Sequence, residues 1–236
     1  MHPIIREIRA DLKASADEKT RSSAQLFFKE EVRLYGVKTA MVRKIARTRF
    51  SEIKDRGKEE LFMLCEELFK SGYIEEAFIA CNWSYFLHNK YEPTDFETFE
   101  GWVEKYVSNW ATCDTFCNHT IGSFIEQYPE YLKELKEWAR SENRWVRRAA
   151  AVSLIVPAKQ GRFLKEAFEI SDILLSEKDD IVQKGYGWLL KEESRKHQKE
   201  VYGYIVENKN VMPRTALRYA IELMPESLKA EAMKRD

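Results

Sequence analysis

The chain has 236 residues, of which 44% are hydrophobic and 33% are charged. This length suits one large domain or two small ones and is enough to bury a full core. Lysine plus arginine and aspartate plus glutamate number 39 each. This balance excludes a protein that is basic throughout, so any surface for an anionic partner must be local.

Cysteine usage and hydropathy indicate a reduced, cytoplasmic setting. The four cysteines lie within helical patterns and are too few for a disulfide scaffold. Cys113, Cys117 and His119 are spaced along one expected helix, whereas tetrahedral metal sites usually draw ligands from separate elements, so we expect neither a metal nor another cofactor. No targeting pattern opens the chain, and no apolar run approaches the roughly 20 residues of a membrane span, so no membrane association is expected.

Apolar residues recur at intervals of three and four throughout, and no segment alternates with a period of two. This periodicity predicts an all-α chain. Glycine and proline fall at or near the expected joints between helices. The expected helices are 4–15, 18–34, 39–54, 58–70, 73–90, 95–107, 110–127, 130–140, 143–155, 161–175, 179–195, 198–208, 213–224 and 226–235.

Three of these helices begin with a similar motif, in which a polar or basic pair precedes small residues and a large apolar residue. The motif lies at residues 146–152, 182–188 and 213–219. Repeats of this length predict a curved solenoid of HEAT-like antiparallel helical repeats forming a single domain over 1–236. Small residues would let neighbouring helices approach, and the polar pair would line the exposed inner edge. A generic helical bundle is the alternative.

In such a solenoid the second helix of each pair normally lines the concave side. The residues expected there are mostly cationic: Arg43, Arg47, Asp114, Arg147, Arg148, Lys184, Trp188, Lys191, Arg214 and Arg218. Acids are expected to face outward, among them Glu59, Glu60, Glu66, Glu67, Glu75 and Glu76. A groove lined with arginine and lysine would suit a nucleic-acid backbone, although each of these charges alone is typical of a solvated helix face.

One constellation could carry chemistry. Trp110 and Asp114 are four residues apart and share a helix face, and the repeats could bring Arg148 and Trp188 to the same patch. Indole faces attract the C–H bonds of a sugar or a cationic ring. A carboxylate between them could stabilise an oxocarbenium ion or orient a water molecule. The structural alternatives are tryptophans that only pack in the core and an aspartate held by a partner.

Several segments of the chain resemble the DNA alkylation repair proteins of the AlkD type, which are HEAT-like-repeat DNA glycosylases. Residues 36–43 resemble the N-terminal DNA-contacting segment of that family, and Asn-Trp-x-x-x-Asp at 109–114 resembles its catalytic helix. Residues 144–149 resemble its Trp-x-x-Arg segment, and 183–192 are similar to its Gln-Lys-x-x-Gly-Trp signature.

The resemblance implies a glycosylase that acts on double-stranded DNA and excises cationic N3- or N7-alkylated purines. A monomer is expected, because a solenoid with atypical end helices is usually monomeric. The resemblance also implies that Asp114 is the catalytic carboxylate, that Trp110 and Trp188 cradle the deoxyribose, and that Arg148 contacts the backbone near the lesion. The expected DNA-binding residues are Thr39, Arg43, Arg47, Arg147, Lys184 and Lys191.

The chain departs from the family pattern at three places. A tyrosine of the second N-terminal helix is replaced by Phe27 or Phe28, an arginine by Lys191, and a proline by Ala40. These changes affect the grip on DNA rather than the carboxylate. Two alternatives therefore remain, namely a non-catalytic binder of branched or damaged DNA and a protein-interaction solenoid.

Overall fold

The computed structural model describes residues 2–234, and this part of the chain is helical apart from turns and one isolated bridge between Arg33 and Tyr73. The predicted all-α fold is confirmed. None of the described helices is long and apolar enough to cross a membrane. The chain divides into two compact units between Phe116 and Cys117. A single domain over 1–236 stays a prediction, and residues 1, 235 and 236 lie outside the described residues.

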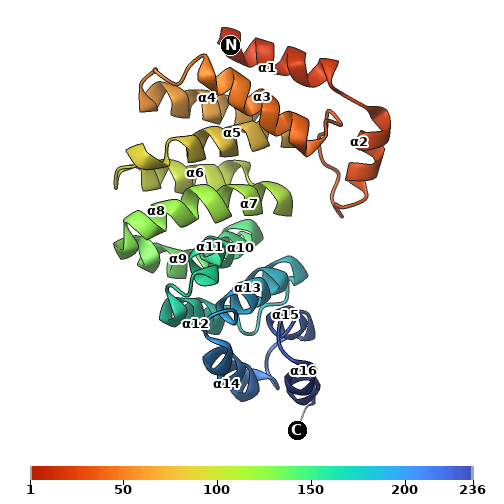
Figure 1. The fold of residues 1–236 in the computed structure, drawn as a ribbon, viewed down its shortest axis with the longest axis vertical. Coiled ribbons are helices and arrows are strands. Elements are labelled where there is room, and N and C mark those ends of the chain that lie inside the picture. Colours follow the sequence, from red (N-terminus) through yellow and green to blue (C-terminus); the bar gives the residue numbers. More distant parts are fainter. Residues whose placement is uncertain (1, 235–236) are drawn as a thin grey trace. The chain divides into compact units, whose positions relative to one another are not determined.

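Unit 1 contains seven α-helices and one short 3-10 helix, His88–Lys90, within its described residues. Their bounds are α1 (Pro3–Ala14), α2 (Glu18–Gln25), α3 (Thr39–Ser51), α4 (Lys58–Lys70), α5 (Ile74–Phe86), α6 (Asp95–Tyr106) and α7 (Trp110–Phe116). Helices α3, α5 and α7 pack side by side as one row, while α4 contacts both α5 and α6 in a second row (Figure 1). Between the rows, the rings of Phe69 on α4 and Phe99 on α6 pack edge to face against Phe116 on α7, with interplanar angles of 79° and 80°.

Unit 2 repeats the two-row arrangement with shorter helices. Their bounds are α8 (Gly122–Gln127), α9 (Leu132–Trp138), α10 (Arg144–Val152), α11 (Ile155–Lys159), α12 (Leu164–Ile173), α13 (Asp180–Glu193), α14 (Gln198–Asn208), α15 (Arg214–Ala220) and α16 (Glu226–Ala232). Helix α13 lies between α10 and α15 in one row, and α9 contacts α12 in the other (Figure 1). The antiparallel helical repeats predicted from the sequence are therefore present.

Two glycines allow α13 to approach both neighbours. A Cβ atom on Gly187 would lie 2.6 Å from the carbonyl oxygen of Ala216 and 2.8 Å from the Cβ of Tyr219, so α13 and α15 meet at backbone distance. A Cβ on Gly185 would lie 3.3 Å from the Cγ of Arg148 on α10. The expectation that small residues permit close helix packing is confirmed here. The expectation of an exposed polar pair fails at Arg148 and Gln183, which are buried.

Some predicted helix boundaries are wrong. The predicted helix 18–34 ends at Gln25, because the Gln25 side chain donates to the carbonyl of Glu30 and accepts from the N–H of Val32. These bonds hold residues 26–38 as an ordered, irregular segment. The predicted helix 143–155 ends at Val152, and a separate short helix follows it. The last predicted helix, 226–235, ends at Ala232, and residue 235 is outside the described range.

Glu75 and Glu76 do not face outward as predicted, since their exposed fractions are only 3% and 0%. Buried carboxylates are stable only with partners. Glu76 accepts hydrogen bonds from the hydroxyl of Tyr35 (2.8 Å) and from the guanidinium of Arg9 (3.0 Å). Glu75 accepts from backbone N–H groups of the segment before α3. Both acids tie this segment to α5.

Glu193 on α13 is a different kind of buried acid. Its side chain is fully buried, and neither carboxylate oxygen has a hydrogen-bond partner among the described residues. Burial, reinforced by the charge of Glu166, raises the pKa of Glu193 to about 8. The folded protein therefore keeps this carboxyl protonated at neutral pH.

Replacing Gly187 by alanine should lower the free energy of unfolding by about 1–3 kcal/mol, because the added methyl group overpacks the contact between α13 and α15. Urea unfolding measures the difference. Gly203 is the matched control, since a Cβ there meets nothing within 4 Å and Gly203→Ala should stabilise its helix by about 0.5–1 kcal/mol. Equal destabilisation by both substitutions would contradict the close approach.

Glu193→Gln should flatten the pH dependence of stability. Between the ordinary pKa of 4.5 and the folded value of about 8, the folded protein holds a proton that the unfolded chain has lost. Wild-type stability should therefore fall as pH rises through this window, by up to about 1.4 kcal/mol per pH unit from this group. Urea unfolding of both proteins across the window measures the difference, and parallel curves would show that Glu193 is ionised in the fold.

Candidate functional site

Helix α7 presents Trp110 and Asp114 on one face. The helix begins at Trp110 because the Asn109 side chain accepts a hydrogen bond of 2.9 Å from the backbone N–H of Thr112 and caps the first turn. One turn later comes Asp114, and both side chains are half-buried. The predicted sharing of a face by these two residues is confirmed.

A cavity of about 200 Å³ lies against this face and is called the Asp114 pocket below. It is lined by Thr39, Val42, Arg43, Phe78, Asn82, Trp110, Ala111, Asp114 and Thr115. These residues come from α3, α5 and α7, the three helices of one row. The structure thus brings the predicted residues Thr39 and Arg43 to the same cavity as Trp110 and Asp114.

The indole of Trp110 is fixed by the segment that follows α2. Phe28 stacks on it with ring centroids 5.4 Å apart and an interplanar angle of 23°. The indole N–H donates to the carbonyl oxygen of Phe27 over 3.2 Å. Of the two phenylalanines that could replace the family's tyrosine, Phe28 is therefore the one whose ring contacts Trp110.

A second cavity of about 180 Å³, called the Phe28 pocket below, adjoins the first. The two cavities share Thr39, Phe78, Trp110 and Ala111 in their walls. Phe27, Phe28 and Leu34 make the Phe28 pocket mainly apolar. Trp110 therefore stands between two cavities with mainly apolar walls, and Asp114 lines only one of them.

The position of this segment depends on Glu75 and Gly36, which sequence reasoning did not single out for this role. Glu75 accepts from the N–H groups of Tyr35 (3.1 Å), Gly36 (2.8 Å) and Val37 (3.1 Å). Gly36 has a φ of +87°, and a Cβ there would lie 2.5 Å from the carbonyl oxygen of Asp17. Only glycine fits this turn. The motif Gly-x-x-Thr at 36–39 was a usable signal, but its partner Glu75 was not visible.

The cations of α3 are available to a ligand. Thr39, Arg43 and Arg47 follow one another at intervals of four, so they share one helix face, and all three are exposed. Within residues 2–234, neither Arg43 nor Arg47 forms an ion pair or a hydrogen bond. A helix face with two free guanidinium groups therefore leads to the Asp114 pocket.

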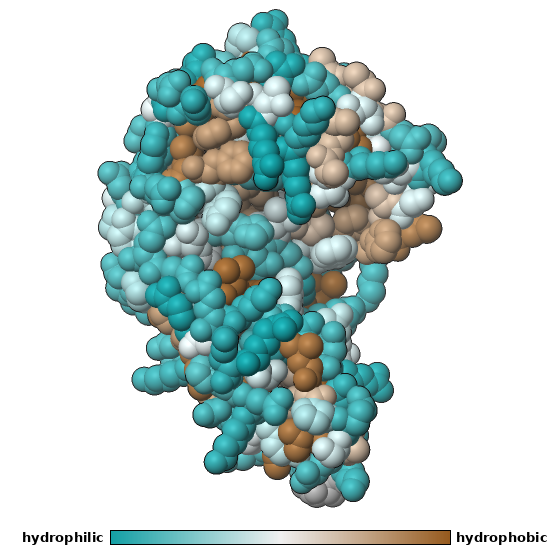
Figure 2. Space-filling model, in the orientation of Figure 1, coloured by the Kyte–Doolittle hydropathy of each residue, from teal (hydrophilic) through white to brown (hydrophobic). Residues whose placement is uncertain are grey.

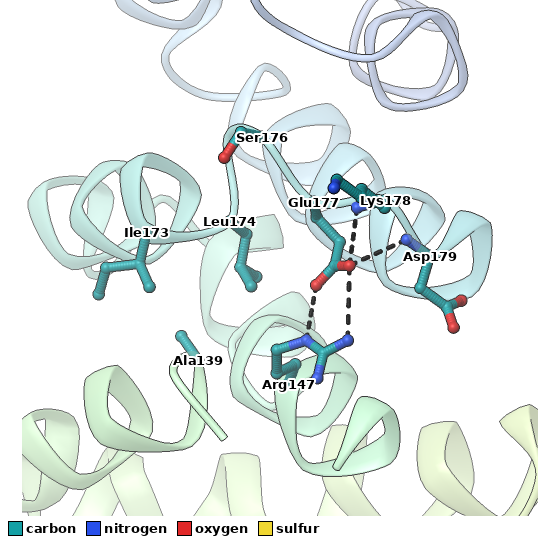
Figure 3. Close-up of a pocket in the computed structure, with 8 residues that line it drawn as sticks. All are labelled: Ala139, Arg147, Ile173, Leu174, Ser176, Glu177, Lys178 and Asp179. Carbon is teal, nitrogen blue, oxygen red and sulfur yellow. Dashed lines mark hydrogen bonds and ion pairs between the residues drawn. The ribbon is translucent and has the colours of Figure 1, made fainter. Parts of the chain in front are cut away.

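The predicted DNA-binding cations of unit 2 have protein partners instead. Arg147 donates to Glu177 (2.6 Å) and to the carbonyls of Ser141 (2.8 Å) and Glu142 (2.9 Å). Figure 3 shows its guanidinium aimed at Glu177 beside a cavity of about 640 Å³. Burial opposes ionisation of Glu177, but Arg147 and backbone N–H groups outweigh it and hold the pKa of Glu177 below its usual range.

Lys184 and Lys191 are paired as well. Lys184 pairs with Asp180 at 3.0 Å, and Lys191 pairs with Glu222 at 3.2 Å. The two lysines therefore differ from Arg43 and Arg47, because a phosphate would have to compete with a carboxylate for each of them.

Arg148 and Trp188 also lie in unit 2. Arg148 is buried and donates to the carbonyl of Ile181, in the space that Gly185 leaves open. Trp188 is half-buried, and its indole N–H donates to Glu192 over 3.2 Å. The expected convergence of these two side chains with Trp110 and Asp114 stays a prediction.

The Asp114 pocket offers a defined set of chemical groups. Its walls carry one carboxylate, one indole face, a guanidinium, an amide from Asn82, and the hydroxyls of Thr39 and Thr115. Such a set can stabilise positive charge and orient a water molecule. Within the part of the chain that the structure describes, no three histidine, cysteine, aspartate or glutamate residues are grouped so as to hold a metal ion.

The fold and these cavities define an all-helical repeat protein with a carboxylate pocket in unit 1, and comparisons specify the family. The family model described as DNA alkylation repair enzyme matches residues 8–224. The chain therefore belongs to this family, and its partner is DNA.

A solved structure described as a predicted DNA alkylation repair enzyme from Enterococcus faecalis has a similar fold, with a TM-score of 0.80 and 16% sequence identity. The match covers 90% of this chain and 98% of that one. No curated protein sequence matches the chain.

Because Arg43 and Arg47 are unpaired among the described residues, Arg43→Gln and Arg47→Gln should each weaken DNA binding and lower the slope of log affinity against log salt by about 0.9. Fluorescence anisotropy with a duplex oligonucleotide at several salt concentrations measures both quantities. Arg56 is the matched control, since it is exposed but already paired with Glu60. An equal loss of slope in Arg56→Gln would contradict a specific role for the α3 face.

Proposed function

We propose that this protein is a DNA glycosylase that removes cationic N3- or N7-alkylated purines from double-stranded DNA. The proposal rests on family membership together with one observation, which is the meeting of Asp114, Trp110 and Arg43 at a single cavity. The DNA alkylation repair family supplies the substrate class, and the cavity supplies the groups that the reaction needs.

An alkylated purine carries a positive charge that weakens its bond to the sugar. When the C1′–N bond breaks, the bonding electrons leave with the base, the base becomes neutral, and the sugar becomes an oxocarbenium ion. The Asp114 carboxylate stabilises this cation by its negative charge and accepts a hydrogen bond from the attacking water. Water adds to C1′ and gives its proton to the Asp114 carboxylate, which passes it to solvent, and this leaves a free base and an abasic site.

The neighbours of Asp114 have roles consistent with this step. The Trp110 face packs against the C–H groups of the deoxyribose and attracts its developing positive charge. Arg43, which also lines the pocket, binds a backbone phosphate next to the damaged nucleotide.

A second candidate is a DNA binder of the same family without base excision. Two observations favour it, since Phe28 brings no hydroxyl to the Trp110 wall and Arg148 is committed to the carbonyl of Ile181. This candidate shares the DNA-binding face of α3 but leaves Asp114 without a chemical task. Base release therefore separates the two functions.

Asp114→Asn should lower the rate of base release from N-methylated duplex DNA by about 100-fold or more, because the amide has no charge with which to stabilise the cation. Chromatographic detection of free methylated base under single-turnover conditions measures the rate. Anisotropy should show that the variant binds the same DNA within about threefold of wild type, since the amide keeps the shape of the carboxylate.

Asp55→Asn serves as the control, because Asp55 is exposed after α3 and lines neither pocket. It should release base at the wild-type rate. Equal slow release by wild type and Asp114→Asn, with DNA binding intact, would replace the glycosylase proposal with the non-catalytic one.

A further inference from the structure

Two large apolar side chains project into solvent where α2 ends. Leu26 has an exposed fraction of 86% and Phe27 of 74%. Side chains of this size and hydrophobicity are usually buried, and adjacent exposed ones can mark an interaction surface. Figure 2 shows apolar atoms at the surface near this end of α2. Neither residue has a role in the chemistry proposed above.

This apolar tip, defined as Leu26 and Phe27, is held in place by hydrogen bonds rather than being loose. The N–H of Phe27 donates to the carbonyl of Ala24 over 3.1 Å, which continues the last turn of α2. Gln25 then bonds to the backbone of Glu30 (2.9 Å) and Val32 (3.3 Å), and so closes the turn beneath the tip. The exposed side chains are therefore presented at a defined place.

The tip is linked directly to the Trp110 wall. The carbonyl of Phe27 accepts the indole N–H of Trp110, and the next residue, Phe28, stacks on the same indole. Trp110 also lines the cavity that contains Asp114. All of these residues belong to unit 1, and Phe27 lines the Phe28 pocket, which adjoins the cavity that contains Asp114.

Charge next to the tip favours DNA as the occupant over an apolar protein surface. Thr39 lines both pockets and begins the exposed face that carries the unpaired Arg43 and Arg47. Phosphates bound to this face would bring a duplex against α2. Proteins that bind the minor groove frequently insert an apolar side chain such as phenylalanine or leucine between base steps.

We propose that Phe27, assisted by Leu26, inserts into the base stack of duplex DNA beside the damaged nucleotide. The inference rests on the proposed function, because it takes the substrate to be a damaged nucleotide held at Asp114. Phe27 is then a positioning residue. It occupies the space from which a stacked base has been displaced, and it holds the distorted duplex while the sugar lies against Trp110.

The test uses a duplex with a tetrahydrofuran abasic analogue flanked by 2-aminopurine, whose fluorescence rises when the base is unstacked. Wild-type protein should raise the fluorescence several-fold on saturation. Phe27→Ala should lose most of that rise and weaken binding to this duplex by about 5- to 100-fold, which corresponds to the loss of one stacking contact. Phe27→Trp should restore the signal, because it keeps a flat ring.

Met63→Ala is the matched control, since Met63 is 65% exposed on α4 and lines neither pocket, and it should behave as wild type. The assay measures DNA binding and unstacking without base release. Its result can therefore be interpreted even if the protein proves not to be a glycosylase. Two results would overturn the inference. One is an unchanged fluorescence rise in Phe27→Ala, and the other is wild-type binding without any rise.

Light scattering of wild type and Phe27→Ala completes the test. If the wild type self-associates and the variant does not, the tip is a contact between copies of the chain, and DNA insertion is refuted. Equal masses at the monomer value, together with the lost fluorescence, support insertion.

Discussion

The carboxylate of Glu75 is the contact on which the candidate site depends. Its two oxygens are buried and accept hydrogen bonds from the three consecutive backbone N–H groups of residues 35–37. These donors belong to an irregular segment and have no helix to satisfy them, so losing the acceptor would leave them all unpaired. With these hydrogen bonds to Glu75 formed, Gly36 packs against the start of α2, and the segment leads into α3, which begins at Thr39. The residues that contact Trp110 lie within the same segment.

Sequence periodicity was sufficient to locate most of the helices but not to predict this segment. The predicted helix 58–70 has the observed bounds, because its apolar positions repeat cleanly and Gly57 precedes it. Residues 26–34 also carry apolar residues at helical spacing, yet Gln25 bonds to the backbone ahead of it and ends α2. A side chain that hydrogen-bonds to the backbone can prevent the next helical turn from forming, and the spacing of apolar residues does not reveal this.

The burial of two charged side chains, Glu75 and Glu76, was also not predictable from the sequence. Glu59 and Glu60 face solvent as expected, whereas Glu75 and Glu76 do not, although both pairs occupy the first turn of a helix. The difference comes from partners more than 35 residues away, at Tyr35 and Arg9. Trp110 and Asp114 were predictable because four-residue spacing fixes their shared face locally. Long-range partners are not encoded in local spacing.

The two units use their cations differently. In unit 1 the α3 arginines are unpaired among the described residues, while in unit 2 Arg147, Lys184 and Lys191 neutralise acids of the fold. Cationic side chains thus stabilise the fold in unit 2 and stay available to a ligand in unit 1. For a member of the DNA alkylation repair family, this asymmetry favours the proposal that α3 makes the first electrostatic contact with DNA.

The bond between Trp110 and residue 27 has one more consequence, because its acceptor is a main-chain carbonyl. Every amino acid at position 27 supplies the same acceptor, so the side chain there can change without releasing the indole. The exposed side chain of the apolar tip and the wall beside the carboxylate can thus vary independently in evolution. Substitution at this one residue can alter the exposed surface while the position of the indole beside Asp114 is inherited unchanged.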